Sequence, residues 1–483
     1  MTAYDFDLVV IGSGPAGEKG AVKAAYFGKR VAVVERFPEL GCECRKAGLP
    51  SKVLREAALS YSGARRRLGD LFRVEPGAPM RMESFLTASD ALCANHAGRV
   101  ADNLARHGVP CIRGTARFVD PHRIAVTDGE QTRELTAGAV LIATGSRPHR
   151  PAYIPFGQPG VHCSDTVLGM DRLPRSLTVV GAGVIGTEYA SIFQALGVEV
   201  RLLDGRTRVL GFLDVEIHDR LLEELRERGM RTHLGEQVTT CRVLDSGEVE
   251  VVTDKGTVVQ SEALLFSGGR TANTDTLGLR EIGVELGRHG RPVVDAALRT
   301  SVPHIFAAGD VIGFPGLAST GMEQGRIAVS SAFAIEEQFG GRADLAPAQG
   351  AFPGPLLPYG VYTIPSVSMV GLTEEQVATS GRPYAVGRAS YARQDRGPLV
   401  GDTTGLLKLV CDAKTRELLG VHIVGETAEE LIHLGQACMC LGGGIDYFLR
   451  TVFNFPTLAA LYKAAAYDVL THLGPERDRF AIR

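Results

Sequence analysis

The hydrophobic positions of this chain describe the same strand–turn–helix–strand unit twice. In the first copy, apolar strands over 5–11 and 30–34 flank a glycine-rich turn and a helix. In the second copy, strands over 176–180 and 198–203 flank a turn and a helix of the same kind. Each copy ends at an acidic residue, which is typical of a dinucleotide-binding fold. The repeat therefore predicts two nucleotide-binding domains.

The rest of the chain has a different pattern. Residues 83–106 have helical periodicity, and 109–143 alternate as short strands separated by turns. After a proline-rich segment over 340–359, strand-like pieces cover 361–426 and helical pieces cover 427–470. The last part of the chain is therefore expected to form a separate α+β domain.

These boundaries predict an α/β protein with three domains. A first nucleotide-binding domain covers 1–150 and closes with 275–348, and a second is inserted at 151–274. An α+β domain spans 349–483. A chain of 483 residues is long enough for several hydrophobic cores of ordinary size.

The composition argues against several classes of partner. The 52 basic and 55 acidic residues give a net charge of −3, whereas nucleic acids and anionic membranes call for a basic surface. No apolar run approaches the roughly 20 residues of a membrane span, and no secretory signal is visible. The 9 cysteines are odd in number and dispersed, which indicates a reducing cytoplasm and no disulfide framework.

Both turns carry the spacing Gly-x-Gly-x-x-Gly. The first glycine allows the tight turn, the second lets the backbone approach a pyrophosphate, and the third lets the helix pack on the strand. The start of the helix then faces the phosphates, and the acidic residue at the end of the second strand accepts a hydrogen bond from a ribose hydroxyl. The two sets are Gly12, Gly14, Gly17 and Glu35, and Gly181, Gly183, Gly186 and Asp204.

Two further segments narrow the interpretation. Ala143-Thr144-Gly145 ends one apolar strand, and Gly309-Asp310 ends another. With the first glycine turn, in this order, they resemble the FAD-binding fingerprints of the pyridine nucleotide–disulfide reductase family. The resemblance implies that Glu35 binds the adenosine ribose of FAD, that Asp310 binds the ribityl chain, and that the second glycine turn binds NAD(P)H. The other FAD-binding positions it implies are Thr144, Gly145 and Gly309.

The same resemblance assigns roles to Lys52 and Glu188. Lys52 follows Leu49-Pro50-Ser51, and Glu188 follows Gly186-Thr187, as in the family's motifs. The resemblance implies that Lys52 lies near flavin N5 and pairs with Glu188, and a cation there favours the negative charge of reduced flavin. We therefore expect both residues to be catalytic and Lys52 also to bind the flavin.

The chain departs from the family at the dithiol machinery. Disulfide-reducing members have Cys-x4-Cys before Pro-Ser-Lys, but this chain has Cys42 and Cys44 in a loop that is one residue short. The C-terminal His and Glu that serve the thiol are replaced by Phe455 and Ala460. Without an imidazole the site lacks the base for thiol exchange, which argues against reduction of lipoamide or glutathione. The two cysteines are then spare thiols or a strained redox pair, and no metal site is expected.

What remains is a flavin facing a nicotinamide. Within the family the chain is most similar to the soluble pyridine nucleotide transhydrogenases, through segments such as Tyr362-Thr363-Ile364-Pro365 and Phe453-Asn454-Phe455-Pro456-Thr457. The resemblance implies a homodimer in which 349–483 form the dimerisation domain at the subunit interface and residues 453–462 cover the partner's flavin. We therefore predict a cytoplasmic enzyme that uses FAD to pass hydride from NADPH to NAD+. An NAD(P)H:quinone or dye oxidoreductase and a non-catalytic flavoprotein are the alternatives.

The turn after the second copy bears on nucleotide choice. An acid accepts a hydrogen bond from the 2′-hydroxyl of NAD(H), whereas arginine attracts the 2′-phosphate of NADP(H). The turn contains both kinds of group, in Asp204, Arg206 and Arg208. We predict that it binds both nucleotides, and the alternative is that the two arginines are solvated charges.

Overall fold

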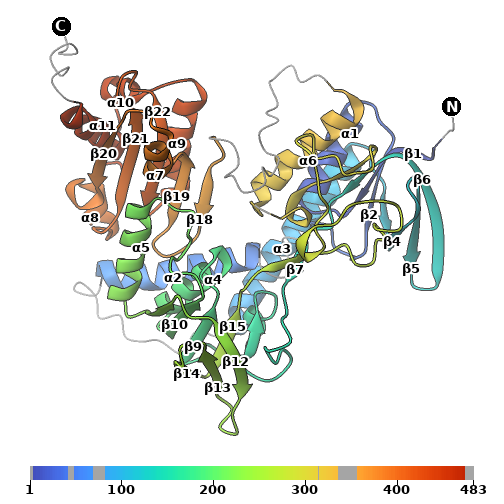
Figure 1. The fold of residues 1–483 in the computed structure, drawn as a ribbon, viewed down its shortest axis with the longest axis horizontal. Coiled ribbons are helices and arrows are strands. Elements are labelled where there is room, and N and C mark those ends of the chain that lie inside the picture. Colours follow the sequence, from blue (N-terminus) through green and yellow to red (C-terminus); the bar gives the residue numbers. More distant parts are fainter. Residues whose placement is uncertain (1–3, 42–47, 69–81, 314, 336–355, 474–483) are drawn as a thin grey trace. The chain divides into compact units, whose positions relative to one another are not determined.

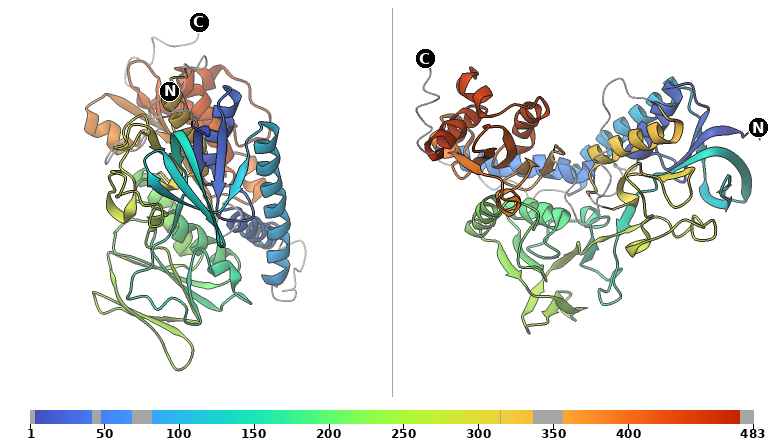
Figure 2. Two further views of the ribbon diagram at one scale, coloured as in Figure 1. Left: turned by 90° about the vertical axis from the view of Figure 1, so that its right-hand side faces the viewer. Right: turned by 45° about the horizontal axis from the view of Figure 1, so that its top comes forward.

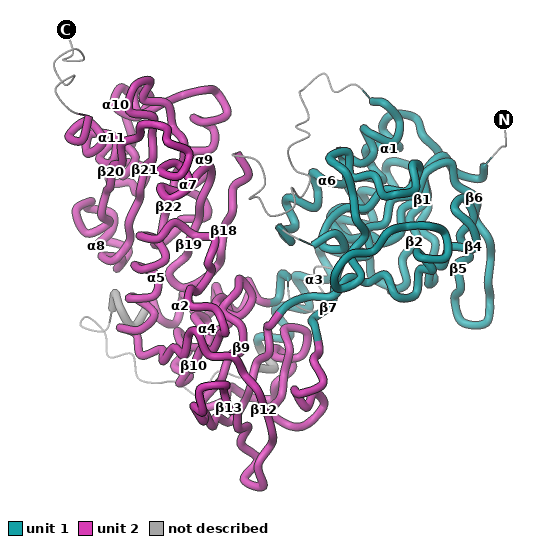
Figure 3. Tube along the Cα trace, in the orientation of Figure 1, with its two compact units in different colours: residues 1–50, 84–149, 269–354 teal, residues 51–83, 150–268, 355–483 magenta. Residues whose placement is uncertain are grey.

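The computed structural model describes residues 4–41, 48–68, 82–313, 315–335 and 356–473. The chain divides into two compact units (Figure 3). Unit 1 comprises residues 1–50, 84–149 and 269–354, and unit 2 comprises residues 51–83, 150–268 and 355–483. Unit 1 therefore contains most of the first predicted nucleotide-binding domain, but not residues 51–83, and unit 2 contains residues 51–83 and most of the other two predicted domains. The division into three domains stays a prediction.

Unit 1 is built on a parallel sheet that continues into an antiparallel ribbon (Figure 1). The strand order is β3-β2-β1-β6-β5-β4, and β17 pairs with β6. β2 (Val31–Glu35) is buried along its whole length, as expected for a parallel strand that is covered on both faces. The other strands are β1 (Phe6–Ile11), β3 (Cys111–Arg113), β4 (Thr115–Asp120), β5 (Arg123–Asp128), β6 (Gln131–Ile142) and β17 (Ile305–Ala307), with β7 (Ser146–Pro148) and β16 (Arg270–Ala272) forming a separate ribbon.

Helices α1 (Pro15–Tyr26) and α6 (Ala318–Phe333) pack side by side against this sheet, and α3 (Met82–Arg106) is the long helix of the same unit (Figures 1 and 2). The contact between α1 and α6 depends on glycine, because a Cβ on Gly325 would collide with the carbonyl oxygen of Ala16. A Cβ on Gly309 would lie 3.1 Å from Ala16 Cβ. The turn after β17 is thus held against the start of α1.

Unit 2 contains a second parallel sheet, in the order β11-β10-β9-β15-β8. Its strands are β8 (Val161–Cys163), β9 (Ser176–Val180), β10 (Glu199–Asp204), β11 (Arg231–Leu234) and β15 (Ala263–Phe266). The antiparallel strands beside it are β12 (Val238–Val243), β13 (Val249–Thr253) and β14 (Val258–Ser261), and the helices are α2 (Leu49–Leu68), α4 (Val184–Ala195) and α5 (Val215–Glu227). Asp214 caps α5, because its side chain accepts the backbone N–H of Glu216 at 3.1 Å.

The C-terminal part of unit 2 is an antiparallel sheet in the order β18-β19-β22-β21-β20. The strands are β18 (Tyr359–Val361), β19 (Val367–Gly371), β20 (Tyr384–Ser390), β21 (Leu406–Asp412) and β22 (Leu418–Val424). Its helices are α7 (Glu374–Ser380), α8 (Arg396–Val400), α9 (Ala428–Cys440), α10 (Ile445–Arg450) and α11 (Ala460–His472). Helix α7 begins with a capping box, in which the side chains of Thr373 and Gln376 each accept the other's backbone N–H.

The predicted α/β fold, with two nucleotide-binding sheets and an α+β C-terminal part, is confirmed. The strand predicted over 176–180 is β9, and the one predicted over 30–34 begins and ends one residue later, as β2. Most of the proline-rich segment at 340–359 lies outside the described residues. Among the helices that the structure describes, none combines the length and the apolar character needed to cross a bilayer.

Candidate functional site

The first glycine turn of unit 1 brings backbone against backbone. Gly12 has φ +104°, and a Cβ there would collide with the carbonyl oxygen of Ala143. A Cβ on Gly17 would collide with the carbonyl oxygen of Gly12, so the first turn of α1 lies directly on the glycine turn. Gly14 immediately precedes α1 and leaves the start of the helix uncovered by a side chain. This geometry suits a diphosphate at the helix start.

Glu35 holds this turn in place. It ends β2, is 8% exposed, and its Oε2 accepts both the backbone N–H and the hydroxyl of Ser13, at 2.9 and 2.8 Å. Its Oε1 accepts the backbone N–H of Phe37 at 3.1 Å. Ser13 was not singled out from the sequence, and its position between the first two glycines was the available signal.

The remaining predicted FAD residues gather at the same edge of the sheet. Thr144 and Gly145 follow β6, and Gly309 and Asp310 follow β17. Because β1, β2, β6 and β17 are parallel, the carboxyl ends of these strands meet where the glycine turn lies. The sequence motifs therefore converge on one site within unit 1.

Two residues to which the sequence assigned no role brace this edge. Asn273 donates its side-chain N–H to the carbonyl oxygen of Thr144 at 2.9 Å. Arg270 donates from Nε to Ser146 Oγ at 2.7 Å and lies 3.9 Å from Asp310 Oδ2. Ser146 also donates to Asp310 at 3.2 Å. Arg270 and Asn273 thus hold the turn after β6 and the carboxylate of Asp310.

The residues of this edge fit an FAD molecule. Thr144 Oγ1 is buried and has no hydrogen-bond partner among the described residues. A buried hydroxyl without a partner is costly, so a polar ligand atom at this point would satisfy it. Gly12 and Gly14 provide the open backbone that a diphosphate requires, and Glu35 lies at the strand end where ribose binds.

The second glycine turn, in unit 2, repeats the geometry of the first. Gly181 has φ +109°, and a Cβ there would lie 2.9 Å from the backbone of Ser267. A Cβ on Gly186 would collide with the carbonyl oxygen of Gly181. Gly183 precedes α4, and a Cβ there would meet only Arg206 Nη2, at 3.8 Å. The space in front of Gly183 is thus open except for one guanidinium group.

Asp204 is bound on both carboxylate oxygens. Oδ2 accepts the backbone N–H of Ala182 at 2.5 Å and Arg206 Nη2 at 2.7 Å, and Oδ1 accepts Arg206 Nε at 2.9 Å. Burial works to raise the pKa of Asp204, but hydrogen bonds from Arg206 and the backbone outweigh it and lower the pKa. Arg208 donates instead to the carbonyl oxygen of Leu213 at 3.1 Å. The structure therefore pairs Asp204 with Arg206 and gives Arg208 a different partner.

Lys52 and Glu188 form an ion pair in unit 2. Lys52 Nζ on α2 lies 2.7 Å from Glu188 Oε2 on α4, and the Glu188 side chain is 9% exposed. Glu188 Oε1 accepts the backbone N–H of Tyr362 at 2.8 Å, and the Lys52 ammonium lies 4.6 Å from the centre of the Tyr362 ring. The pairing expected from the sequence is present, and the role of the pair at a flavin stays a prediction.

Arg55 supports this pair and was missed in the sequence. It is 4% exposed, and its guanidinium lies 5.4 Å from the centre of the Tyr362 ring and 3.3 Å from Glu429 Oε1. It also donates to Ser366 Oγ. Arg55 follows Lys52 by three positions on one helix, and this spacing was the signal that could have placed both on one face.

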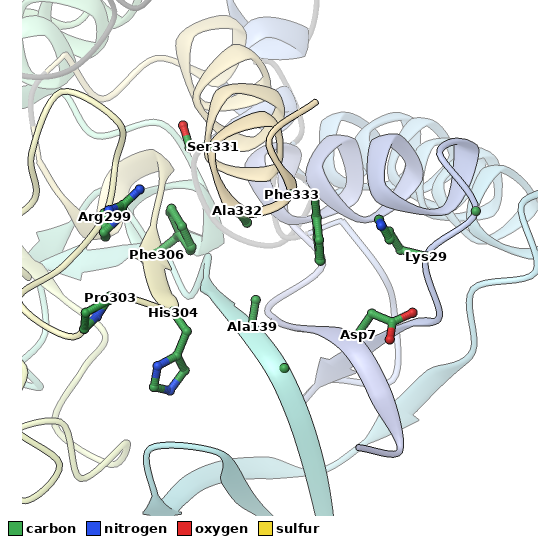
Figure 4. Close-up of a pocket in the computed structure, with 12 residues that line it drawn as sticks. Asp7, Lys29, Ala139, Arg299, Pro303, His304, Phe306, Ser331, Ala332 and Phe333 are labelled. Carbon is green, nitrogen blue, oxygen red and sulfur yellow. The ribbon is translucent and has the colours of Figure 1, made fainter. Parts of the chain in front are cut away.

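A cavity of about 530 Å³ lies at the opposite edge of the unit 1 sheet (Figure 4). It is lined by Asp7 at the start of β1, by His304 just before β17 and by Phe333 at the end of α6. In Figure 4 its two basic side chains, Lys29 and Arg299, lie on either side of Phe333. The two cations therefore do not converge, and the cavity is separate from the edge that carries the glycine turn.

The structure describes only some of the residues at which this chain departs from the family's dithiol motif. Cys42 and Cys44 lie outside the described residues. Phe455, in the place of the histidine, is 82% exposed in the single chain, and Val452 nearby is 90% exposed. Ala460 is the first residue of α11. Neither Phe455 nor Ala460 carries a group that can accept a proton.

Comparison with known proteins supports the family resemblance over nearly the whole chain. The family model described as pyridine nucleotide-disulphide oxidoreductase matches residues 6–325, and the model of that family's dimerisation domain matches residues 357–466. The chain is 41% identical over 478 residues to the soluble pyridine nucleotide transhydrogenase of Mycobacterium tuberculosis, covering 97% of this chain and 98% of that protein. It is also 41% identical over 483 residues to the soluble pyridine nucleotide transhydrogenase of Chromohalobacter salexigens, covering 98% and 100%.

Solved structures with the same fold are less similar in sequence. The Cu(II) complex of the HOCl-induced flavoprotein disulfide reductase RclA from Escherichia coli aligns with a TM-score of 0.84 at 26% identity, covering 97% of this chain and 99% of that one. LpdA from Mycobacterium tuberculosis aligns with a TM-score of 0.84 at 26% identity, covering 95% and 99%.

The open space in front of Gly183 generates a prediction. Gly183→Ala should leave the free energy of unfolding within about 0.5 kcal/mol, because the new methyl group meets no backbone. It should weaken NADPH binding at least about tenfold, because the methyl group takes the place of the pyrophosphate. Thermal unfolding and titration of NADPH fluorescence would measure the two effects.

Gly186→Ala is the matched contrast, because its methyl group would collide with the carbonyl oxygen of Gly181. It should destabilise the fold by about 1–3 kcal/mol. If NADPH binds Gly183→Ala as tightly as the original protein, the pyrophosphate does not pass this turn.

Proposed function

Since the chain belongs to the pyridine nucleotide-disulphide oxidoreductase family, we propose that it is an FAD-dependent soluble transhydrogenase that passes hydride from NADPH to NAD+. Both relatives named as transhydrogenases match over nearly their whole length at 41% identity. The structural relatives, one of which is titled a disulfide reductase, match at 26%. The higher similarity is thus to proteins that exchange hydride between nucleotides.

The observation that carries the proposal is the pairing of Asp204 with Arg206. A transhydrogenase must bind a nucleotide with a free 2′-hydroxyl and one with a 2′-phosphate. A carboxylate suits the hydroxyl, and a guanidinium suits the phosphate. The Arg206 side chain is 61% exposed whereas that of Asp204 is 8% exposed, so the arginine is free to leave its partner while the acid stays in place. One turn can therefore serve both nucleotides.

The C-terminal residues support the same choice over disulfide reduction. Thiol exchange needs a base that moves protons, and the side chains of Phe455 and Ala460 are purely apolar. The proposed reaction needs no such base, because hydride carries both electrons and the proton between two nucleotides. Loss of the base is thus compatible with transhydrogenation.

In this proposal, residues of unit 1 bind the FAD and residues of unit 2 bind the nicotinamide nucleotides. FAD, when bound, supplies a ring that can accept and return hydride. The turn after β1, with Glu35, Thr144 and Asp310, would hold it in unit 1. The turn after β9 would hold the diphosphate of NADPH or NAD+ in unit 2, and much of the rate enhancement would come from this positioning. Lys52, kept in one orientation by Glu188, would stabilise negative charge that develops on the flavin.

We further propose that the protein is a cytoplasmic homodimer. The match to the dimerisation domain supports self-association. Val452 and Phe455, three positions apart in the sequence, are 90% and 82% exposed in the single chain, and exposed large apolar side chains are common at interfaces. The net charge of −3 argues against nucleic acid as a partner.

The test is NADPH-driven reduction of thio-NAD+ by purified, FAD-loaded protein, followed at the absorbance of the reduced thionicotinamide. We expect exchange without added thiol. If NADPH bleaches the flavin but thio-NAD+ is not reduced, electrons leave to another acceptor and the transhydrogenase proposal fails. Quinones would then be the first acceptors to assay. If neither nucleotide bleaches the flavin, the protein is not a nicotinamide-dependent enzyme.

Lys52→Ala should slow flavin reduction by NADPH about tenfold or more, because a cation that stabilises developing charge is lost. The amount of bound FAD should change little. Stopped-flow absorbance at saturating NADPH measures the rate. Arg242→Ala is a suitable control, because it breaks an ion pair of 2.6 Å to buried Glu250 in the same unit. Equal reduction rates in Lys52→Ala and the original protein would remove Lys52 from the mechanism.

Arg206→Gln should separate the two nucleotides. NADPH binding should weaken about tenfold, equivalent to about 1.4 kcal/mol, because the partner of the 2′-phosphate is lost. NADH binding should hold or improve, because Asp204 no longer has to release a guanidinium. Dissociation constants from fluorescence titration decide this, with Arg226→Gln, an exposed arginine bound to Thr232, as the control. An equal loss for both nucleotides would contradict a role in discrimination.

A further inference from the structure

A cluster of charged residues around buried Lys408 in unit 2 has no part in the reaction proposed above. Lys408 on β21 is 1% exposed, and its ammonium contacts three carboxylate groups. These are Asp214 at 2.8 Å, Glu216 at 3.1 Å and Glu374 at 2.6 Å. Asp214 and Glu216 lie at the start of α5, beside the nucleotide-binding sheet, whereas Lys408 and Glu374 belong to the C-terminal part. The cluster thus joins segments 194 residues apart in sequence.

The charge of Lys408 is compensated by these acids, and its neighbours on the adjacent strands do not compensate it. Arg388, opposite it on β20, binds Glu216 at 2.7 Å. His422, opposite it on β22, is fully buried, and its Nε2 lies 2.9 Å from the carbonyl oxygen of Leu372. Burial lowers the pKa of His422, which disfavours a second buried cation beside Lys408. A buried ammonium is costly unless it is paired, so Lys408 holds its acidic partners tightly.

Asp214 is the member of the cluster that connects it to the turn proposed to bind the nucleotide. Its side chain is 0% exposed, and its Oδ2 also accepts the backbone N–H of Glu374 at 3.1 Å. It directly follows Leu213, whose carbonyl oxygen accepts a hydrogen bond from Arg208 at 3.1 Å. Asp214 therefore marks the end of the turn that begins with Asp204 and contains Arg206.

The same turn is fastened to the glycine turn in a strained conformation. Leu210 donates its backbone N–H to the carbonyl oxygen of Ala182 at 2.9 Å, between Gly181 and Gly183. Leu210 has φ +46°, a left-handed conformation that a branched side chain adopts only when its surroundings impose it. Leu213, three positions later, is 3% exposed, and Asp214 follows it directly. The ion pair between Asp214 and Lys408 therefore fixes the C-terminal end of this turn.

We propose that Lys408 is a positioning residue for the nucleotide site: by clamping Asp214, it holds the 204–213 turn against the Gly181–Gly186 turn. This rests on the proposed function only in taking the 204–208 turn as the ribose site of NADPH and NAD+. Lys408 acts through Asp214 and touches no reacting atom. Loss of the clamp releases the turn from its strained conformation and weakens binding of both nucleotides, because both use the same turn.

Lys408→Met tests this in the FAD-loaded enzyme. We expect the dissociation constants of NADPH and NADH each to rise about tenfold, the size of effect that a small displacement of a binding group produces. The limiting rate of flavin reduction at saturating NADPH should stay the same, because Lys52 and Glu188 are untouched. Binding is measured by nucleotide fluorescence and so does not depend on turnover. Absence of thio-NAD+ reduction in the original protein would overturn the proposed function but not this one.

Arg228→Met is the matched control, because Arg228 pairs with buried Glu224 at the end of α5, whereas Lys408 pairs with buried Asp214 at its start. The proposal is supported if Lys408→Met weakens both nucleotides and Arg228→Met weakens neither. It is overturned if Lys408→Met lowers the melting temperature alone, or if both variants weaken binding equally. If Lys408→Met yields no folded protein, Asp214→Asn decides by the same criteria, since it keeps the helix cap and removes the charge.

Discussion

Each glycine turn depends on one carboxylate that accepts a backbone N–H from the residue between its first two glycines. Glu35 accepts from Ser13 at 2.9 Å, and Asp204 accepts from Ala182 at 2.5 Å. The N–H groups of such a turn would otherwise be unsatisfied, and the acid at the end of the next strand supplies the acceptor. The acid therefore fixes the glycine turn, in addition to the ribose contact that we propose for it.

The two turns differ in what else binds their acid. Glu35 is held by neutral donors, from the hydroxyl of Ser13 and the backbone of Phe37. Asp204 is held by the exposed guanidinium of Arg206, which can exchange its partner for a phosphate. Neutral local donors suit a cofactor that stays in place. A displaceable cation suits a site that releases one nucleotide and accepts another, and this is the physical difference behind the proposed reaction.

Ion pairs to buried carboxylates join distant segments of unit 2. Lys52 and Glu188 lie 136 residues apart, and Lys408 and Asp214 lie 194 residues apart. Each pair includes a carboxylate that is almost fully buried, so loss of its cation would leave an uncompensated charge. We expect such pairs to specify one arrangement of distant segments more than they add stability. In unit 2 they connect α2 with α4, and β21 with the start of α5.

The sequence alone was sufficient for the fold class, the two glycine turns, their acids and the pairing of Lys52 with Glu188. Glycine spacing and strand hydrophobicity report local backbone geometry, and a family motif carries long-range pairs that its residues already encode. Only the tertiary structure showed that Glu35 and Asp204 accept hydrogen bonds from their own glycine turns. It also showed that Asp204 pairs with Arg206 and not with Arg208. The burial of Arg55 and Lys408 next to acidic residues was likewise visible only in the structure. Those contacts join positions with no periodic relation in the chain, so no local pattern of hydrophobicity or charge could predict them.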